Sequence, residues 1–438
     1  MPRRRMHLVG YLIAGPTWHH NSAWRMPGSD AEEALTPERY ERLARAMEQA
    51  CFDGLFFVDT LALMEFYGGS FDAVLRNGGQ IYMLEPLQLL AAIARATTRI
   101  GLSATMSTAF YHPFHIARAF ATLDHISSGR AGWNVVTSTL DREAQNFGMD
   151  RLPPAQDRYD HADEVVEACF KLWDSWDADA IRYDRERGLY ADPAKVHRAD
   201  FAGRWVRTRG PLPTPRMPQG RPVIMQAGSS PRGRAFAARW AEVVFTLQHA
   251  KDDMRAFYDD LKSRMQAHGR APHECAILPA IDVVVGETDA VARERAAYLD
   301  EMVNAEFAVA EMSNATGNDL SRHPLDTPVA DLACNEGAHG MLDVILQGSG
   351  PGATLLEAGR RYGNTRMNPQ IVGTPSSIAD HLQDLFESGC CDGFVLCPAI
   401  SPGMYVDFCR MVVPELQRRG LFRGEYAGRT FREHLQQG

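Results

Sequence analysis

The feature that constrains this 438-residue sequence most is a repeated alternation of two patterns. Apolar runs of strand length alternate with amphipathic stretches of helix length, and several runs contain almost no polar residue. Parallel strands covered by helices on both faces have this composition, because neither face of the sheet meets water. Eight such units predict an α/β fold closed into a (β/α)₈ TIM barrel, which takes about 250 residues before insertions. The predicted strands are His7–Ala14, Gly54–Asp59, Ile100–Thr105, Ala131–Thr137, Pro222–Ala227, Val243–Leu247, Ala276–Val285 and Gly393–Cys397.

Helix-opening signals lie between these strands. Thr36 suits the N-cap of a helix, and Pro37 suits its first position. Tyr40, Leu43 and Met47 then recur at helical spacing, which predicts a buried face. The same criteria predict helices at Pro86–Thr97, Pro113–Ile126, Tyr159–Trp176 and Pro231–Ala241.

Three stretches interrupt the repeat, at residues 65–82, 177–219 and 302–374. Each follows the carboxyl end of a predicted strand or the helix after it. We therefore expect one barrel domain over residues 1–438, with insertions at the C-terminal face of the strands, where the active sites of such barrels lie. The alternative that these stretches form an oligomer interface stays open, above all for 302–374.

The charge balance and the apolar runs exclude several classes of protein. A formal net charge of −9 argues against a nucleic-acid partner, which favours a basic face. No run approaches the roughly 18 apolar residues of a membrane span. The apolar run at residues 7–14 is too short and broken for a signal peptide, so we expect a cytoplasmic protein. No carboxylate stands at a familiar ligand spacing from the histidines, so no metal site is predicted.

Polar but mostly uncharged residues end the predicted strands. Gly228, Ser229 and Ser230 follow the fifth strand and come directly before Pro231. A glycine lets the backbone approach a ligand, and the start of a helix offers unpaired N–H donors. The positive end of the helix dipole adds to this preference for an anion, so the segment predicts a phosphate cradle. A plain N-cap is the alternative that stays open.

Other catalytic signatures are absent from the sequence. It contains no G-x-x-x-x-G-K-[ST] loop, no G-x-G-x-x-G opening a helix, no H-E-x-x-H and no G-x-S-x-G. A barrel mouth with neutral donors but no obvious nucleophile or metal suits a bound cofactor that performs the difficult chemical step while the protein orients it.

One long segment carries a family resemblance. Residues Thr122–Ser138, which read TLDHISSGRAGWNVVTS, resemble the signature of luciferase-like flavin monooxygenases. More narrowly, they are similar to the nitrilotriacetate, dibenzothiophene-sulfone and pristinamycin-synthase monooxygenase components. The resemblance covers nearly the whole chain. It continues through His20–Arg25, Phe52–Asp59, Gln226–Ser230, Phe236–Phe245, Cys391–Val395 and Val413–Leu421.

The resemblance implies a two-component, FMNH₂-dependent monooxygenase. A separate NAD(P)H:flavin reductase would supply reduced FMN, which reacts with O₂ to a C4a-peroxide that passes one oxygen atom to a small organic substrate. It also implies a homodimer or homotetramer. The flavin-binding positions that it carries onto this sequence are Asp59, Thr105, Asn134, Thr137, Tyr159 and Ser230.

The resemblance also implies roles for these positions. Tyr159 and Ser230, together with the backbone of Gly228 and Ser229, would hold the FMN phosphate. Arg158 would be a charge partner, because a guanidinium matches phosphate oxygens.

One position departs from the family pattern. Relatives have a histidine four residues before the tyrosine, where this sequence has Ala155. Either one flavin contact is lost or Gln156 replaces it.

The residues that take part in proton transfer and substrate binding are less defined. His20, with His19 beside it, and Ser138 are the candidate catalytic groups. Two other functions stay open: a deazaflavin-dependent oxidoreductase of the same fold, and a non-catalytic flavin-binding protein. The aromatic residues that either line an apolar substrate pocket or belong to the core are Trp18, Trp24, Phe66, Tyr67 and Phe110.

Overall fold

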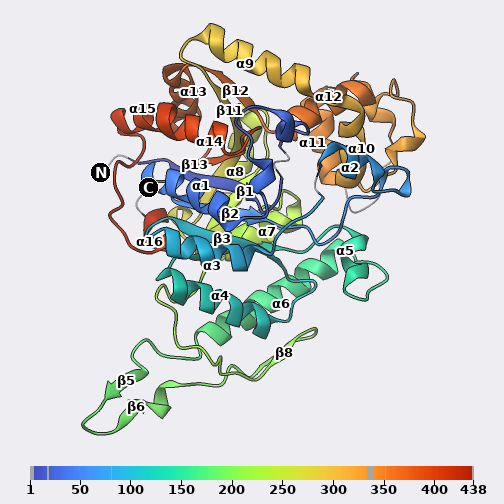
Figure 1. The fold of residues 1–438 in the computed structure, drawn as a ribbon. Coiled ribbons are helices and arrows are strands. Elements are labelled where there is room, and N and C mark those ends of the chain that lie inside the picture. The colour runs from blue at the N-terminus through green and yellow to red at the C-terminus, as the bar shows by residue number, and fades with distance from the viewer. Residues whose placement is uncertain (1–3, 17–18, 80, 333–338, 351, 437–438) are drawn as a thin grey trace.

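The computed structural model describes residues 4–16, 19–79, 81–332, 339–350 and 352–436. Eight parallel strands in this part of the chain form a closed barrel in the order β1–β2–β3–β4–β9–β10–β11–β13, with β13 paired back to β1 (Figure 1). The predicted (β/α)₈ barrel is confirmed, and every predicted strand end lies within two residues of the observed one. The strands are β1 (His7–Ile13), β2 (Gly54–Val58), β3 (Gly101–Ser107), β4 (Ala131–Val136), β9 (Val223–Gln226), β10 (Val243–Thr246), β11 (Ala276–Val285) and β13 (Gly393–Leu396).

Helices cover the outside of the barrel and confirm the five helix predictions. The fourth begins at Ala155 rather than Tyr159, so Tyr159 lies inside the second turn. Thr36 occupies the predicted N-cap position, but its hydroxyl donates to the carbonyl oxygen of Glu33 and caps no N–H group. The α-helices are α1 (Pro37–Gln49), α2 (Asp72–Asn77), α3 (Pro86–Ala96), α4 (Pro113–Ser127), α5 (Asp141–Asn146), α6 (Ala155–Trp173), α7 (Pro231–Trp240), α8 (Lys251–Ala267), α9 (Asp289–Met302), α10 (Ala305–Thr316), α11 (His339–Ser349), α12 (Leu355–Thr365), α13 (Pro375–Glu387), α14 (Gly403–Asp407), α15 (Val413–Arg418) and α16 (Phe431–Leu435).

The inside of the barrel is filled by side chains rather than open. Alternate residues of the strands, such as Val9, Met225 and Leu278, form a buried apolar cluster. At the amino-terminal end of the barrel this cluster includes Phe431 of α16, which is fully buried. A Cβ added to Gly101 of β3 would lie 2.3 Å from the Phe431 ring, so the glycine makes room for it. The C-terminal helix therefore closes one end of the barrel.

Two of the predicted insertions pack together beyond the opposite, carboxyl-terminal end of the strands (Figure 1). Residues 65–82 contain α2, whose Val74 packs against Phe307 and Ala310 of α10. The Asn304 amide nitrogen donates to the Asn77 side-chain oxygen at 2.9 Å. Residues 302–374 hold α10 to α12 and a ninth parallel strand, β12 (Gln370–Gly373), which the sequence did not predict and which pairs with the second half of β11.

The insertion at residues 177–219 lies differently from the other two. Because it leaves the carboxyl end of α6, it starts at the amino-terminal end of the barrel, where the hairpin β5 (Ile181–Asp184) and β6 (Leu189–Ala191) projects away from the body (Figure 1). The hairpin β7 (Phe201–Ala202) and β8 (Arg207–Thr208) lies against the outside of the barrel, where a His112 ring nitrogen is 3.1 Å from the Arg207 carbonyl oxygen.

The described residues contain no helix that combines the length and the apolar character needed to cross a membrane.

Candidate functional site

Two polar side chains lie on neighbouring strands near the carboxyl-terminal end of the barrel. Thr105 of β3 stands opposite Asn134 of β4 in the strand register, and both are buried. The Asn134 amide nitrogen donates to Thr105 Oγ1 at 2.8 Å, and that hydroxyl donates to the Phe57 carbonyl oxygen at 2.7 Å. Since each group is held by the next, the pair forms a rigid and uncharged polar wall at the mouth.

A second cluster joins three elements beside this wall. The Tyr159 hydroxyl, from α6, lies beside the side chains of Ser230 before α7 and Thr137 after β4. A Cβ added to Gly228 would lie 2.8 Å from the Tyr159 oxygen, and one added to Gly233 would lie 2.9 Å from it. The two glycines therefore let the backbone approach the tyrosine. Burial raises the pKa of Tyr159, so its hydroxyl stays a neutral donor.

The start of α7 supplies the donors of this cluster. Ser230 is the N-cap residue, and its Oγ accepts from the Gly233 N–H group at 3.0 Å. Ser229 and Ser230 are exposed. In the first turn, Pro231 has no N–H group, and the N–H groups of Gly233 and Arg234 are bonded to Ser230 itself. The exposed start of α7 is also the positive end of the helix dipole, which favours an anion there.

Arg158 adds a positive charge next to Tyr159. One of its terminal nitrogens donates to the Pro153 carbonyl oxygen at 3.0 Å, while its Nε is buried without a hydrogen-bond partner. Burial lowers the pKa of Arg158, although the guanidinium remains charged. A buried donor without an acceptor suits an anionic group that is not part of the chain. We call Arg158, Tyr159 and residues 228–230 the phosphate cradle.

Asp59 lies at the same mouth, directly after β2. Burial, followed by the negative charges of Glu85 and Glu143, raises its pKa to about 7. Glu143 is itself held in place, because its Oε1 accepts from the Leu61 N–H group at 3.1 Å. Asp59 therefore gains or loses a proton near neutral pH, unlike an ordinary aspartate.

Replacing Asp59 by asparagine is expected to stabilise the protein more at pH 8 than at pH 5. The pKa of Asp59 is higher in the folded state than in the unfolded state, so its ionisation costs stability increasingly as pH rises from about 4 to about 7. The asparagine variant does not carry this cost. Thermal unfolding at both pH values measures the effect, with the exposed Asp259→Asn as a control. An equal shift at both pH values would contradict the raised pKa.

His20 does not have the surroundings of a proton-transfer group. It is fully buried, its Nε2 meets the Leu299 carbonyl oxygen at 2.8 Å, and its Nδ1 accepts from the Ser22 N–H group at 3.1 Å. Burial lowers its pKa to about 4. Neighbouring His19 is also buried, with a pKa of about 3 for the same reason. Both His20 nitrogens are bonded to the backbone, so the side chain holds the chain after β1 in place.

Ser138, the other candidate catalytic group, has an unusual backbone. Its φ is 58°, in the left-handed region that costs energy for a residue other than glycine. Its hydroxyl lies 2.9 Å from that of Ser107, so the pair bridges the ends of β3 and β4. A strained residue beside the polar wall is typical of a functional site.

The mouth contains residues that the sequence analysis missed. Glu311 of α10 and Arg366 at the end of α12 form a buried ion pair, and Tyr362 lies under the guanidinium at 4.8 Å. Burial raises the pKa of Glu311 to about 7, against the opposing effect of Arg366. The charge of Arg366 also contributes to the low pKa of His19, so the pair lies near the end of β1. Both residues lie in the 302–374 insertion. The sequence analysis looked for site residues at the ends of the predicted barrel strands, and neither residue follows such a strand.

The aromatic residues predicted for the substrate pocket are dispersed. Phe110 stacks on Phe147 at 4.6 Å at the mouth, and Phe66 lies under Arg142 at 4.7 Å. Trp24 is 41% exposed and Tyr67 packs within the insertions, while Trp18 lies outside the described residues. A different aromatic group forms the top of the lumen, with ring centres 5.0 to 6.0 Å apart: Tyr11, Phe56 and Phe245.

Comparisons with known proteins agree with this geometry. A family model described as "Luciferase-like monooxygenase" matches residues 17–391. The chain is 45% identical to "Dibenzothiophene-sulfone monooxygenase" of Rhodococcus erythropolis (strain XP), over 99% of this chain and 97% of that protein. It is 39% identical to "Nitrilotriacetate monooxygenase component A" of Aminobacter aminovorans, over 95% and 93%. A solved riboflavin lyase (RcaE) with modified FMN and riboflavin matches with a TM-score of 0.92 and 32% identity, over 99% and 96%.

Proposed function

Because this chain belongs to the luciferase-like monooxygenase family and is a reduced-flavin-dependent monooxygenase, we propose that its cofactor is reduced FMN held by the phosphate cradle. The observation that carries the proposal is the convergence of Tyr159, Ser230 and Gly228 beside a buried, unpartnered Arg158 nitrogen. FMN ends in a single phosphate, which this set of donors matches. The deazaflavin and non-catalytic alternatives are not favoured, because these relatives are named as monooxygenases.

Each residue of the mouth then has a separate proposed role. Bound reduced flavin supplies the electrons that activate O₂. Tyr159, Ser229 and Ser230 bind the phosphate, with Gly228 allowing the close approach, and Arg158 balances its charge. The Thr105–Asn134 wall orients the flavin ring by hydrogen bonds, with Thr137 supporting Tyr159.

Two further groups manage protons and water. Asp59, with a pKa of about 7, is partly protonated near neutral pH and would be suited to exchange a proton at the mouth. Ser138 and Ser107 present a hydroxyl pair that can relay or orient a proton. The packed insertions around α2 and α10 exclude water from the mouth, which protects reactive oxygen species from decay.

The substrate that the mouth supports best is an uncharged organosulfur compound. The relative at 45% identity is named for a sulfone, and the top of the lumen is aromatic. Near the mouth, Arg142 is paired with Glu65 and Arg366 with Glu311, so these cations are already neutralised. A substrate with several carboxylates would need unpaired cations there.

The supply of reduced FMN is assigned to a separate flavin reductase. The relative named "component A" supports a division between two proteins. We further propose a homodimer or homotetramer in the cytoplasm. Size-exclusion chromatography with light scattering and cell fractionation would measure these two properties.

Reconstitution tests the proposed function directly. Purified protein with chemically reduced FMN and O₂ should consume dibenzothiophene sulfone and yield a product one oxygen atom richer or its breakdown product. Nitrilotriacetate, assayed in parallel, should not be consumed. Turnover of nitrilotriacetate alone would overturn the substrate assignment, and turnover of neither compound with normal FMN binding would do so as well. Absence of reduced-FMN binding would overturn the cofactor assignment.

Replacing Ala155 by histidine is expected to tighten reduced-FMN binding about fivefold, since one added hydrogen bond contributes about 1 kcal/mol. Ala155 is exposed at the first turn of α6, so a larger side chain fits without displacing the core. Gln156 donates to Asp160 at 2.8 Å and is therefore engaged away from the cradle. Anaerobic titration measures the dissociation constant, with Ala155→Leu as the matched apolar control. An unchanged constant would show that the position does not reach the cofactor.

A further inference from the structure

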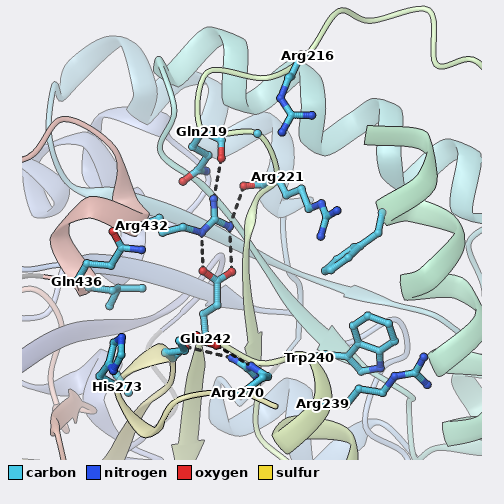
Figure 2. Close-up of a pocket in the computed structure, with 15 residues that line it drawn as sticks. Arg216, Gln219, Arg221, Arg239, Trp240, Glu242, Arg270, His273, Arg432 and Gln436 are labelled. Carbon is cyan, nitrogen blue, oxygen red and sulfur yellow. Dashed lines mark hydrogen bonds and ion pairs between the residues drawn. The ribbon is translucent and has the colours of Figure 1, made fainter. Parts of the chain in front are cut away.

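A large cavity lies at the other end of the barrel from the phosphate cradle (Figure 2). It has a volume of about 910 Å³ and opens at the amino-terminal ends of β9, β10 and β11. Its walls come from the ends of α6, α7 and α16 and from the loop at residues 216–221. A cavity of this size falls in the range of small-molecule sites.

In one part of the cavity wall, the arginine side chains already have protein partners. Arg432 of α16 makes two contacts with the Glu242 carboxylate, at 2.5 and 2.9 Å. Arg270 donates to the carbonyl oxygens of Ala238 and Ala241 at the end of α7, at 3.1 and 2.7 Å. Figure 2 shows the Arg432 guanidinium directly above the Glu242 carboxylate in this wall. These two arginines bind groups of the protein itself and have few donors left for a ligand.

Arg216 and Arg221 differ from this pair, because they share one carboxylate. Arg216 contacts Asp174 at 3.3 Å, and Arg221 contacts the same group through its Nε at 3.2 Å and through a second nitrogen. The side chains of both arginines are about one third exposed, at 34% and 36%. Two guanidinium groups facing one carboxylate leave one positive charge unmatched at the cavity.

Flat surfaces flank this charge. The Arg221 guanidinium lies over the Phe170 ring at 4.2 Å, and Arg239 lies over the Trp240 ring at 4.2 Å. Figure 2 shows Arg221 on one side of the open space and Trp240 with Arg239 on another. A guanidinium that stacks on a ring keeps its in-plane donors for oxygen ligands and its second face for a flat group.

Gln219 lies in the same loop and also lines the cavity. The Gln219 amide nitrogen donates to Asp124 at 2.7 Å and to the Ala131 carbonyl oxygen at 2.6 Å. Its Oε1 is buried and has no hydrogen-bond partner. The Gln219 side chain therefore holds the loop at residues 216–221 against α4 and β4.

We propose that this cavity binds a nucleotide, with its phosphates on Arg216 and Arg221. The unmatched charge recognises phosphate through in-plane guanidinium donors. The stacked arginines accommodate a flat base between Arg221 and the Trp240–Arg239 pair. The site is separate from the phosphate cradle, because the two lie at opposite ends of the barrel.

Calorimetric titration of the full chain with ADP, adenosine and inorganic pyrophosphate tests the proposal. ADP should bind, adenosine should bind at least tenfold more weakly, and pyrophosphate should also bind more weakly than ADP because it lacks the base. Arg221→Ala and, independently, Arg216→Ala should each weaken ADP binding about tenfold or more. The exposed Arg118→Ala on α4 is the matched control and should leave binding unchanged.

Ser230→Asp separates the two sites, since it alters only the phosphate cradle. ADP binding that survives Ser230→Asp and falls in both arginine variants supports the proposal. ADP binding that is lost in Ser230→Asp but kept in both arginine variants would place the nucleotide in the cradle and overturn it. No ADP binding, or pyrophosphate binding as tight as ADP, would also overturn it. Thermal unfolding of each variant confirms that it is folded before titration.

Discussion

Substituting Ser230 by aspartate is expected to weaken reduced-FMN binding about 100-fold or more and to abolish turnover at micromolar FMN. The new carboxylate would stand at the N-cap of α7, where the phosphate is proposed to bind. Two like charges about 4 Å apart near a protein surface repel by about 4 kcal/mol, and about 2.8 kcal/mol suffices for a 100-fold change. Anaerobic titration of each variant with reduced FMN measures the dissociation constant.

Ser230→Asn is the matched control for this substitution. Asparagine and aspartate have nearly the same shape and are equally good N-caps, so both should keep the bond from the Gly233 N–H group and the start of α7. Only aspartate adds a charge. The asparagine variant should therefore lose much less affinity than the aspartate variant. Equal losses in the two variants would show that the hydroxyl, rather than the charge, decides binding, and unchanged affinity in both would remove the phosphate from this site.

Replacing Phe431 by alanine is expected to lower the free energy of unfolding by about 3 to 5 kcal/mol. The ring is fully buried at the amino-terminal end of the lumen, where Gly54 and Gly101 make room for it. Its removal would leave a cavity that the rigid strands of a closed barrel cannot collapse to fill. The Thr430–Glu433 capping box is untouched, so α16 itself can still form.

Urea unfolding measures this change, with the midpoint and slope recorded for each variant. Phe71→Ala removes the same side chain at a position that is 39% exposed and should cost much less. A loss below about 1 kcal/mol at Phe431, equal to that at Phe71, would show that the ring does not close the barrel. Loss of cooperative unfolding would instead indicate that α16 is required for the barrel to form.

The sequence by itself determined the barrel and the position of its chemistry along the chain. The eight apolar runs and the helices that begin with a proline were enough to predict the barrel. Both signals depend on the spacing and type of residues only a few positions apart. Thr105, Asn134 and Ser230 could be expected at one end of the barrel for the same reason: the carboxyl ends of parallel strands meet there. The role of Tyr159 came from family resemblance, since nothing local marks a tyrosine in a helix as a ligand.

The tertiary structure alone decided which side chains meet across long stretches of sequence. Tyr159 reaches Ser230 and Thr137 only when α6, α7 and β4 are packed together. His20 has a typical catalytic side chain, yet packing against Leu299 uses its ring for a structural bond. Glu311 and Arg366 form an ion pair between two helices of the 302–374 insertion. This insertion lacks the strand–helix repeat from which the rest of the site was predicted. Such contacts depend on burial and distance in the folded chain, and no local pattern encodes either.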